Sequence, residues 1–181
     1  MVVSPIDFWG APQLTTERLD LRLPAAADLT AMAEIVAHAE TARHLGPAFD
    51  PADHFMRFTR NAGSWLLYGY GSFIVRLRGS EEVIGNCGAF HSWRGLGEDF
   101  DDTPEAGWIL RHDQVGRGIG REAMSAALGW FDRVQGPRRV VCMSAIGNAP
   151  SLRLAERLGF ARMRDTVLPG GDAVQLFERL P

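Results

Sequence analysis

Three glycines, Gly116, Gly118 and Gly120, stand at alternate positions of the sequence QVGRGIGREA, directly before a helical pattern. Such a run costs backbone entropy and packs no side chains, so the fold must need bare backbone where a strand meets a helix. The first N–H groups of a helix have no partners inside it, and the helix dipole is positive there. Arg117 and Arg121 add positive charge. We therefore predict that this junction binds a phosphate or pyrophosphate; a tight turn without a ligand is the alternative.

The glycine spacing does not match two common phosphate-binding motifs. A dinucleotide fingerprint needs G-x-G-x-x-G, and counting from Gly116 puts Arg121 in the last position. A P-loop needs a lysine, and the sequence contains none. A nucleotide-binding module of another fold is therefore disfavoured.

Length and composition indicate one globular domain over residues 1–181, with an N-terminal arm over residues 1–13. The net charge of −3 argues against a nucleic-acid partner. The two cysteines, Cys87 and Cys142, fall in strand-like stretches and are expected to be buried, reduced thiols. The first residues do not resemble a signal peptide, and no apolar stretch approaches the ~18 residues of a membrane span. We therefore expect a cytoplasmic protein without a membrane partner.

Hydrophobic periodicity predicts the elements along the chain. Strands are expected over 18–23, 70–77, 83–90, 105–111, 138–145, 160–165 and 173–180, and helices over 28–40, from 51, over about 118–135 and over 151–158. This order fits neither a simple βαβ alternation nor an all-β pattern. It predicts an α/β (α+β) fold, with a mixed, mostly antiparallel, twisted sheet of six to seven strands and helices on both faces.

Local signals predict where three of these helices begin or end. Asp28 and Asp50 are expected to be N-caps, and Pro51 suits the first helical position after Asp50. Gly159 is expected at the C-terminal cap of the last helix.

A second motif, NAPSLRLAERLGF, follows the next predicted strand. It places Asn148 and Ser151 at a helix N-terminus, where an N-cap and a first-turn residue would explain both without any ligand. Paired with VGRGIGREA, however, the motif resembles the cofactor half of the GNAT superfamily of acyl-CoA-dependent N-acetyltransferases. The segments LTTERLDLRLPAAADL, EVIGNCGAF and EAGWILR resemble its RimJ/RimL-like branch, which acetylates ribosomal proteins and amino acids. The resemblance runs from about Leu14 to the C-terminus.

The resemblance implies a sheet that splays open between the fourth and fifth predicted strands, with acetyl-CoA bound there as co-substrate and no metal. Its pyrophosphate would bind the glycine loop, its pantetheine arm would follow the fourth strand, and the last helix would contact the thioester end. The residues that this implies for cofactor binding are Ile109, Leu110, Arg111, Val115, Gly116, Arg117, Gly118, Ile119, Gly120, Arg121, Asn148 and Ser151.

Two positions depart from the pattern of the family. The loop often carries Gln or Arg where this sequence has Val115, with Gln114 one residue earlier. Many members have a tyrosine, thought to protonate the leaving thiolate, where this sequence has Ala155. Another group would have to serve, or the thiolate would leave unaided, since a thiol pKa lies near 8.5.

In the implied reaction an amine attacks the thioester directly in a ternary complex. A backbone N–H near Ile109 or Leu110 would stabilise the oxyanion. Glu105, at the start of the fourth strand, and Ser151 are the candidate catalytic residues, with Glu105 taking the proton; a solvated glutamate is the alternative. His91 and Asp99 are weaker candidates for the base.

The acceptor is not identified by the sequence. The loop 92–104 holds Glu98, Asp99, Asp101 and Asp102, which would favour a cationic amine if they line the entrance; a mobile solvated loop is the alternative. The acceptor is expected to be a small-molecule amine or a protein N-terminus, and the protein a monomer or homodimer. A non-catalytic acyl-CoA-binding sensor on the same fold remains the competing function.

Overall fold

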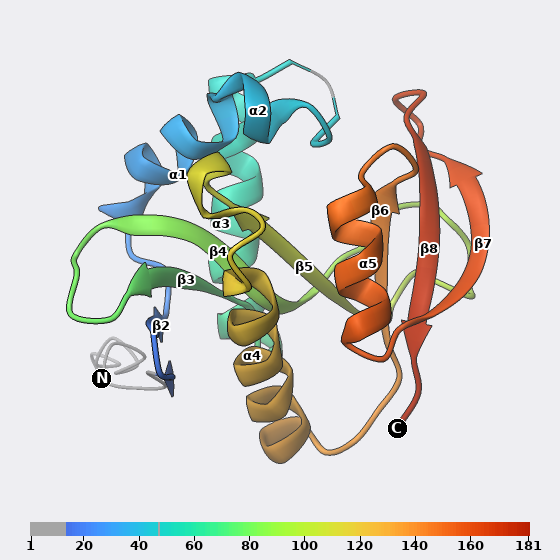
Figure 1. The fold of residues 1–181 in the computed structure, drawn as a ribbon. Coiled ribbons are helices and arrows are strands. Elements are labelled where there is room, and N and C mark those ends of the chain that lie inside the picture. Colours follow the sequence, from blue (N-terminus) through green and yellow to red (C-terminus); the bar gives the residue numbers. More distant parts are fainter. Residues whose placement is uncertain (1–13, 47) are drawn as a thin grey trace, which may run out of the picture.

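The computed structural model describes residues 14–46 and 48–181, so the predicted N-terminal arm lies outside the described residues. The described chain forms β1 (Leu14–Thr15), β2 (Leu19–Arg22), α1 (Asp28–Ala37), α2 (Ala39–Ala42), α3 (Pro51–Tyr68), β3 (Ser72–Leu77), β4 (Val83–His91), β5 (Pro104–Leu110), η2 (His112–Gln114), α4 (Ile119–Gln135), β6 (Val140–Ala145), α5 (Ala149–Arg157), β7 (Ala161–Val167) and β8 (Ala173–Arg179) (Figure 1). Within this part, no helix is both long and apolar enough to cross a membrane.

All the strands belong to one sheet with the order β1-β2-β3-β4-β5-β6-β8-β7. Every neighbouring pair is antiparallel except β5 and β6, which run parallel. The predicted mixed, mostly antiparallel sheet is therefore confirmed. It has eight strands because the two-residue β1 extends the edge beside β2, and so short a segment leaves no periodicity to detect.

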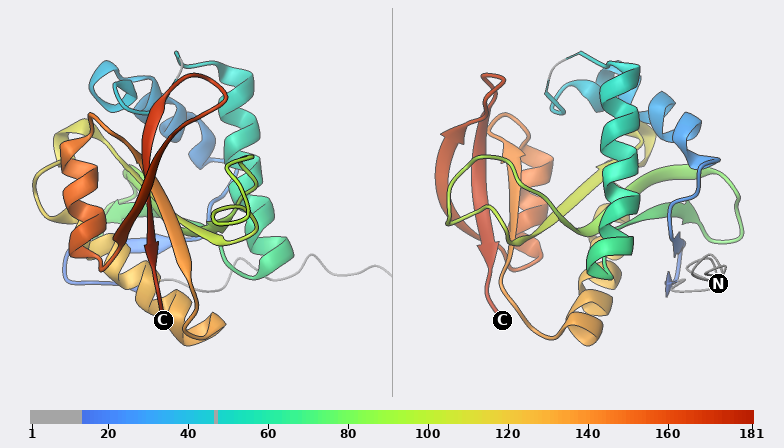
Figure 2. Two further views of the ribbon diagram at one scale, coloured as in Figure 1. Left: turned by 90° about the vertical axis from the view of Figure 1, so that its right-hand side faces the viewer. Right: turned by 180° about the vertical axis from the view of Figure 1, so that it is seen from behind.

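Helices cover both faces of the sheet, and strand alternation decides which side chains meet which helices. Phe73 and Val75 of β3 join the cluster that includes α4, whereas Ile74 between them packs with Met32 and Ile35 of α1. The two faces are visible in Figure 2, where α4 and α5 lie on one side of the sheet and α3 on the other. The core is thus a sheet between two helical layers.

The β4–β5 loop takes the place of a helix over the C-terminal half of the sheet (Figure 2). Its Phe100 is 1% exposed and packs with Val141 of β6 and Val174 and Leu176 of β8. A mobile solvated loop is therefore the wrong interpretation, and a single aromatic side chain in a polar segment accounts for the difference.

The predicted helix ends are confirmed in two of three cases. The Asp50 side chain accepts a hydrogen bond from the N–H of Asp53, 2.8 Å away, at the start of α3. Gly159 follows α5 with a φ of 85°, a conformation that favours glycine. Asp28 is not an N-cap, because its buried carboxylate lies inside the first turn of α1 and pairs with Arg22.

Cys87 and Cys142 are free thiols buried in the sheet, as expected. Burial raises the pKa of both thiols, so they stay protonated near neutral pH. Neither is suited to act as a nucleophile.

Candidate active site

The strands β5 and β6 separate after a short contact. They pair only at Glu105 with Val141 and at Ala106 with Cys142, so residues 107–110 of β5 are bonded to β4 alone. The predicted opening between the fourth and fifth long strands is therefore present. It leaves one edge of β5 free at the centre of the sheet.

The hydrogen-bond register decides which main-chain groups face this free edge. The N–H of Arg111 donates to the carbonyl of Ile84 on β4, and in an antiparallel pair such bonding alternates along the strand. Ile109 therefore also faces β4, whereas Trp108 and Leu110 direct their N–H and C=O groups at the opening. Of the stretch 109–111 implied to hold the pantetheine, Leu110 has the free main-chain groups.

Gly85 allows β4 and β5 to lie this close. A Cβ atom on Gly85 would collide with the carbonyl oxygen of Ile109 and would lie 3.0 Å from the Cα of Leu110. A glycine inside a strand often marks such a close backbone approach. This position thus fixes the edge that faces the opening.

A cleft of about 780 Å³ lies at the opening and is lined by parts of α3, β4, β5, β6, the start of α5 and nearby loops. Four of the predicted site residues line it: Glu105, Ile109, Asn148 and Ser151. The glycine loop does not line this cleft. The loop and the cleft are neighbours, because a Cβ on Gly120 would contact Leu110 of β5 and Leu154 of α5.

Glu105 is buried, with 2% of its surface exposed. Arg94 donates to both of its carboxylate oxygens, at 2.6 and 2.7 Å, and the Ser92 hydroxyl donates to Oε2. A carboxylate offers about four lone-pair sites, so these bonds leave one on Oε1. A solvated glutamate is therefore wrong, and any proton or water that Glu105 accepts in this geometry must use that remaining position.

Ser151 lies across the opening from β5 and is tied to it. The indole Nε1–H of Trp108 donates to Ser151 Oγ at 3.1 Å, and the N–H of Ser151 donates to Oδ1 of Asn148 at 3.2 Å. Asn148 is thus the N-cap of α5. Because Trp108 occupies the acceptor side of the Ser151 hydroxyl, its O–H remains able to donate into the cleft.

The glycine loop presents an uncapped helix N-terminus. Gly116 and Gly118 have φ angles of 81° and 79°, which favour glycine, and no side chain caps α4. The first bond of the helix runs from the N–H of Glu122 to the carbonyl of Gly118, so the N–H groups of residues 119–121 lack a partner within the helix. This local geometry suits a phosphate, as the sequence predicted.

Arg18, the residue before β2, holds the loop in place. Its guanidinium donates to the carbonyl of Arg117 at 3.0 Å and pairs with Glu122 at 2.6 Å. Burial would raise the pKa of Glu122, but hydrogen bonds from Thr16 and Arg18 outweigh it and lower that pKa. The carboxylate thus stays charged but neutralised, which removes its repulsion of an anion at the helix start.

The chain matches the acetyltransferase (GNAT) domain family over residues 18–161. It belongs to the GNAT family. A solved structure described as a GnaT-family acetyltransferase from Bordetella pertussis is 35% identical, with a TM-score of 0.83, over 93% of this chain and 99% of the other. An acetyltransferase from Agrobacterium tumefaciens is 27% identical, with a TM-score of 0.78, over 92% and 94% of the two chains.

More distant neighbours belong to the branch suggested by the sequence. A RimL ribosomal-protein acetyltransferase in complex with coenzyme A is 16% identical, with a TM-score of 0.72, over 93% of this chain and 98% of the other. This likeness shows the shared GNAT fold, and that fold fits the opening between β5 and β6.

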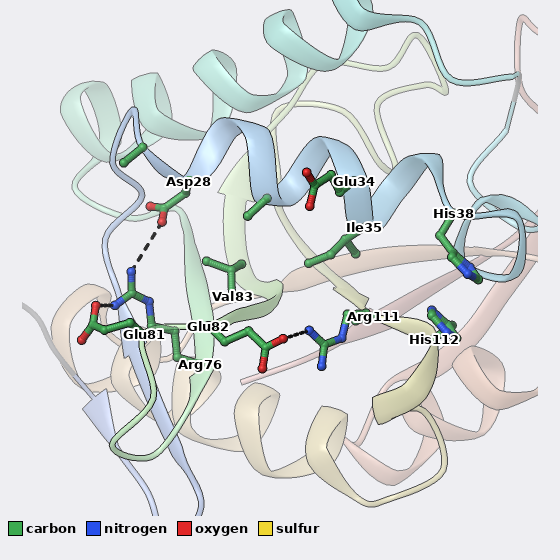
Figure 3. A pocket seen from close by; sticks show the side chains of 12 residues that line it. Asp28, Glu34, Ile35, His38, Arg76, Glu81, Glu82, Val83, Arg111 and His112 are labelled. Carbon is green, nitrogen blue, oxygen red and sulfur yellow. Dashed lines mark hydrogen bonds and ion pairs between the residues drawn. The ribbon is translucent and has the colours of Figure 1, made fainter.

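A second hollow, of about 490 Å³, lies between α1 and the β3–β4 hairpin of the GNAT fold (Figure 3). Its two arginines are already paired: Arg76 with Asp28 and Glu81, and Arg111 with Glu82. Arg111 also pairs with Asp113 at 2.7 Å, and this guanidinium lowers the pKa of Asp113 to about 2. Both the side chain and the N–H of Arg111 are therefore engaged, and its cofactor role stays a prediction.

Acidic residues of the β4–β5 loop form hydrogen bonds and ion pairs that hold the loop in its conformation. Asp99 pairs with Arg164 at 2.8 Å, and this hydrogen bond lowers the pKa of Asp99. Asp101 accepts backbone N–H bonds from three loop residues, Arg94 among them. Asp102 lies 3.1 Å from Nε2 of His91. None of the four acidic residues of the loop, Glu98, Asp99, Asp101 and Asp102, lines the cleft, so the geometry does not support a role for them in attracting a cationic acceptor there.

Sequence reasoning missed the partners of the site. The glycine loop is held by Arg18, Glu105 by Arg94, and Ser151 by Trp108. The sequence around each of these three partners shows no motif that indicates its role. Their contacts span from 11 residues, between Arg94 and Glu105, to 104 residues, between Arg18 and Glu122. Within the described residues, no group of three His, Cys, Asp or Glu side chains could hold a metal ion.

Proposed function

We propose that this GNAT protein transfers an acetyl group from acetyl-CoA to a primary amine by direct attack in a ternary complex. The observation that carries the proposal is the opening between β5 and β6, with an uncapped helix N-terminus beside it and a lined cleft within it. A protein N-terminus or a small molecule would supply the amine.

The cofactor would occupy the opening from the α4 side. Its pyrophosphate would accept hydrogen bonds from the loop 116–121, aided by Arg117 and Arg121. Its pantetheine would bond to the free edge of β5 at Trp108 and Leu110, as an added strand does. The thioester would then reach the cleft beside Ser151.

The reaction needs a proton acceptor on one side and a stabilised leaving group on the other. The amine nitrogen bonds to the thioester carbon, the C–S bond breaks, and the sulfur leaves with the electron pair. We propose that Glu105 takes a proton from the ammonium through the free position on Oε1, directly or through a water, so that the neutral amine attacks. A main-chain N–H at the free edge, at Leu110, would stabilise the oxyanion.

Ser151 is proposed to donate to the sulfur or to the thioester oxygen. Ala155, at the position of the family's tyrosine, is fully buried in the core and presents no polar atom to the cleft. The Ser151 hydroxyl is already oriented by Trp108, and its O–H is available. It is therefore the group that best replaces the missing tyrosine.

Replacing Ser151 with alanine tests this role. We expect Ser151→Ala to lower kcat about 10- to 100-fold, because a hydrogen bond to a developing charge is worth ~1.5–3 kcal/mol. The affinity for acetyl-CoA, measured by calorimetry, should change by less than about threefold. Cysteine at the same position should restore part of kcat, since a thiol also donates weakly. An unchanged kcat would exclude Ser151 from the chemistry.

The experiment that tests the function as a whole is amine-dependent release of free thiol from acetyl-CoA. A sensor protein on the same fold would bind acetyl-CoA, and the ligand would raise the thermal midpoint. It would release no thiol with any amine. Transfer and binding are thereby separated in one protein preparation.

A further inference from the structure

The arginines and the carboxylates that line the cleft are equal in number, but the ion pairs leave one of the arginines without a carboxylate partner. Arg57 pairs with Asp53 at 2.7 Å, and Arg94 pairs with Glu105 at 2.6 Å. Arg60, which also lines the cleft from α3, has no carboxylate within 4.0 Å among residues 14–46 and 48–181. Its charge is therefore available to a ligand.

Arg60 is held over the floor of the cleft. Its guanidinium carbon lies 5.7 Å from the ring centre of Phe90, a cation–π contact that orients the planar group. Phe90 is the cross-strand partner of Glu105, so the guanidinium stands on the same face of the sheet as the proposed base. Burial and the charge of Arg94 lower the pKa of Arg60, whereas the charge of Glu105 raises it. The residue is exposed, so its guanidinium is accessible to a ligand that enters the cleft.

Two further polar atoms in the cleft wall lack a partner. Oδ1 of Asn61 on α3 and Oγ of Ser144 on β6 are buried and make no hydrogen bond within the described structure. Buried polar atoms are seldom left unsatisfied in native proteins. A ligand with N–H donors would satisfy Asn61 Oδ1, while Arg60 and Ser144 could donate to its oxygens.

We propose that the acceptor is a small amine that also carries a carboxylate, that is, a free amino acid, whose carboxylate pairs with Arg60. A guanidinium binds a carboxylate through two parallel hydrogen bonds. A polyamine and an amino-acid amide have no carboxylate and therefore cannot form this pair. This inference rests on the proposed acetyl transfer and names its acceptor. The amino nitrogen of the amino acid is acetylated, its proton passes to Glu105, and CoA leaves as the thiolate.

The test compares free L-amino acids with the matching L-amino-acid amides and with spermidine. We expect kcat/KM to be at least about tenfold higher for the preferred amino acid than for its amide. Arg60→Gln should lower kcat/KM for the amino acid about 10- to 100-fold, mainly through KM, and should leave the amide nearly unaffected. Arg60→Lys should fall in between, since it keeps the charge without the fork. The control variant is Arg133→Gln, which removes one positive charge from an exposed position on α4 outside the cleft. It should leave kcat/KM for both substrates unchanged.

A binding measurement separates this inference from the proposed function. Amino-acid binding to the CoA-saturated protein is measured by calorimetry for the parent and for Arg60→Gln. Binding that the variant weakens at least about tenfold supports the inference, even if no acceptor is turned over. The inference is overturned if amides or spermidine are preferred, if no amino acid binds at millimolar concentration, or if Arg60→Gln leaves the preference unchanged.

Discussion

Glu105→Gln is expected to lower kcat about 10²–10⁴-fold, the usual effect of losing a general base. The fold should survive at a lower thermal midpoint, because the single oxygen of glutamine can accept from Ser92 and from Nε of Arg94, but the amide NH2 cannot accept from Nη2. The affinity for acetyl-CoA should stay within about twofold of the parent. The rate of the variant should recover as pH rises toward the pKa of the amine, where free amine forms in solution, while the parent's rate levels off earlier. Steady-state kinetics from pH 6 to pH 10, with substrate saturation at each pH, would measure this.

Arg94→Gln is the control that separates a base from a structural anchor. It breaks the same ion pair but leaves the Glu105 carboxylate in place. Both variants should lower the thermal midpoint, since removing one partner of a buried pair costs ~3–5 kcal/mol when the other charge stays unpaired. Only Glu105→Gln should show the large loss of kcat with the shifted pH profile. If both variants lose kcat equally and keep the parent's pH profile, Glu105 only holds Arg94 and the β4–β5 loop.

Gly116→Ala is expected to weaken acetyl-CoA binding about 10- to 100-fold. The φ of 81° at Gly116 is strained for alanine, so the loop would relax and move its N–H groups away from the pyrophosphate. Losing one hydrogen bond to a charged group costs ~1.5–3 kcal/mol, and every 1.4 kcal/mol is tenfold in affinity. Calorimetric titration with acetyl-CoA would give the change directly.

Gly136→Ala is the matched control for that experiment. Gly136, after α4, has a φ of 75°, and a Cβ there would meet no atom within 4 Å, as at Gly116. Both substitutions should therefore cost similar stability, of about 1–2 kcal/mol. Only Gly116→Ala should change the affinity. Gly120→Val would be a poorer probe, because a Cβ on Gly120 lies 3.0 Å from Leu154 and would disturb the packing of α4 and α5. Equal affinity in the two alanine variants would remove the loop from the cofactor site.

The sequence predicted the features that depend on neighbouring residues. The strand within residues 18–23, the N-cap at Asp50 and the glycine loop are local patterns, and the structure has each of them. The opening between β5 and β6 was implied by the resemblance of two motifs to GNAT proteins, not by periodicity. The family comparison supports that resemblance.

The rest depends on contacts between residues far apart in the chain. Asp28 was expected to cap a helix, but Arg22 and Arg76 draw its carboxylate into a buried pair. The acidic β4–β5 loop gave no sign that Phe100 would anchor it to the sheet. Glu105 looked like a solvated strand end or a free base, and only the fold brings Arg94 against it. The local pattern thus predicts the secondary structure in which a residue lies, whereas its role depends on contacts with residues far away in the sequence.

The measurement that tests the account most directly is release of free thiol from acetyl-CoA, followed with and without an amine and with the product identified by mass spectrometry. The account predicts thiol release that requires the amine, equals the amount of N-acetylated product, and falls strongly in Glu105→Gln. The contradicting result is a protein that acetyl-CoA stabilises against heat but that releases no thiol with amino acids, their amides, polyamines or peptides with free N-termini. Such a protein would bind acyl-CoA on a GNAT fold without transferring the acyl group.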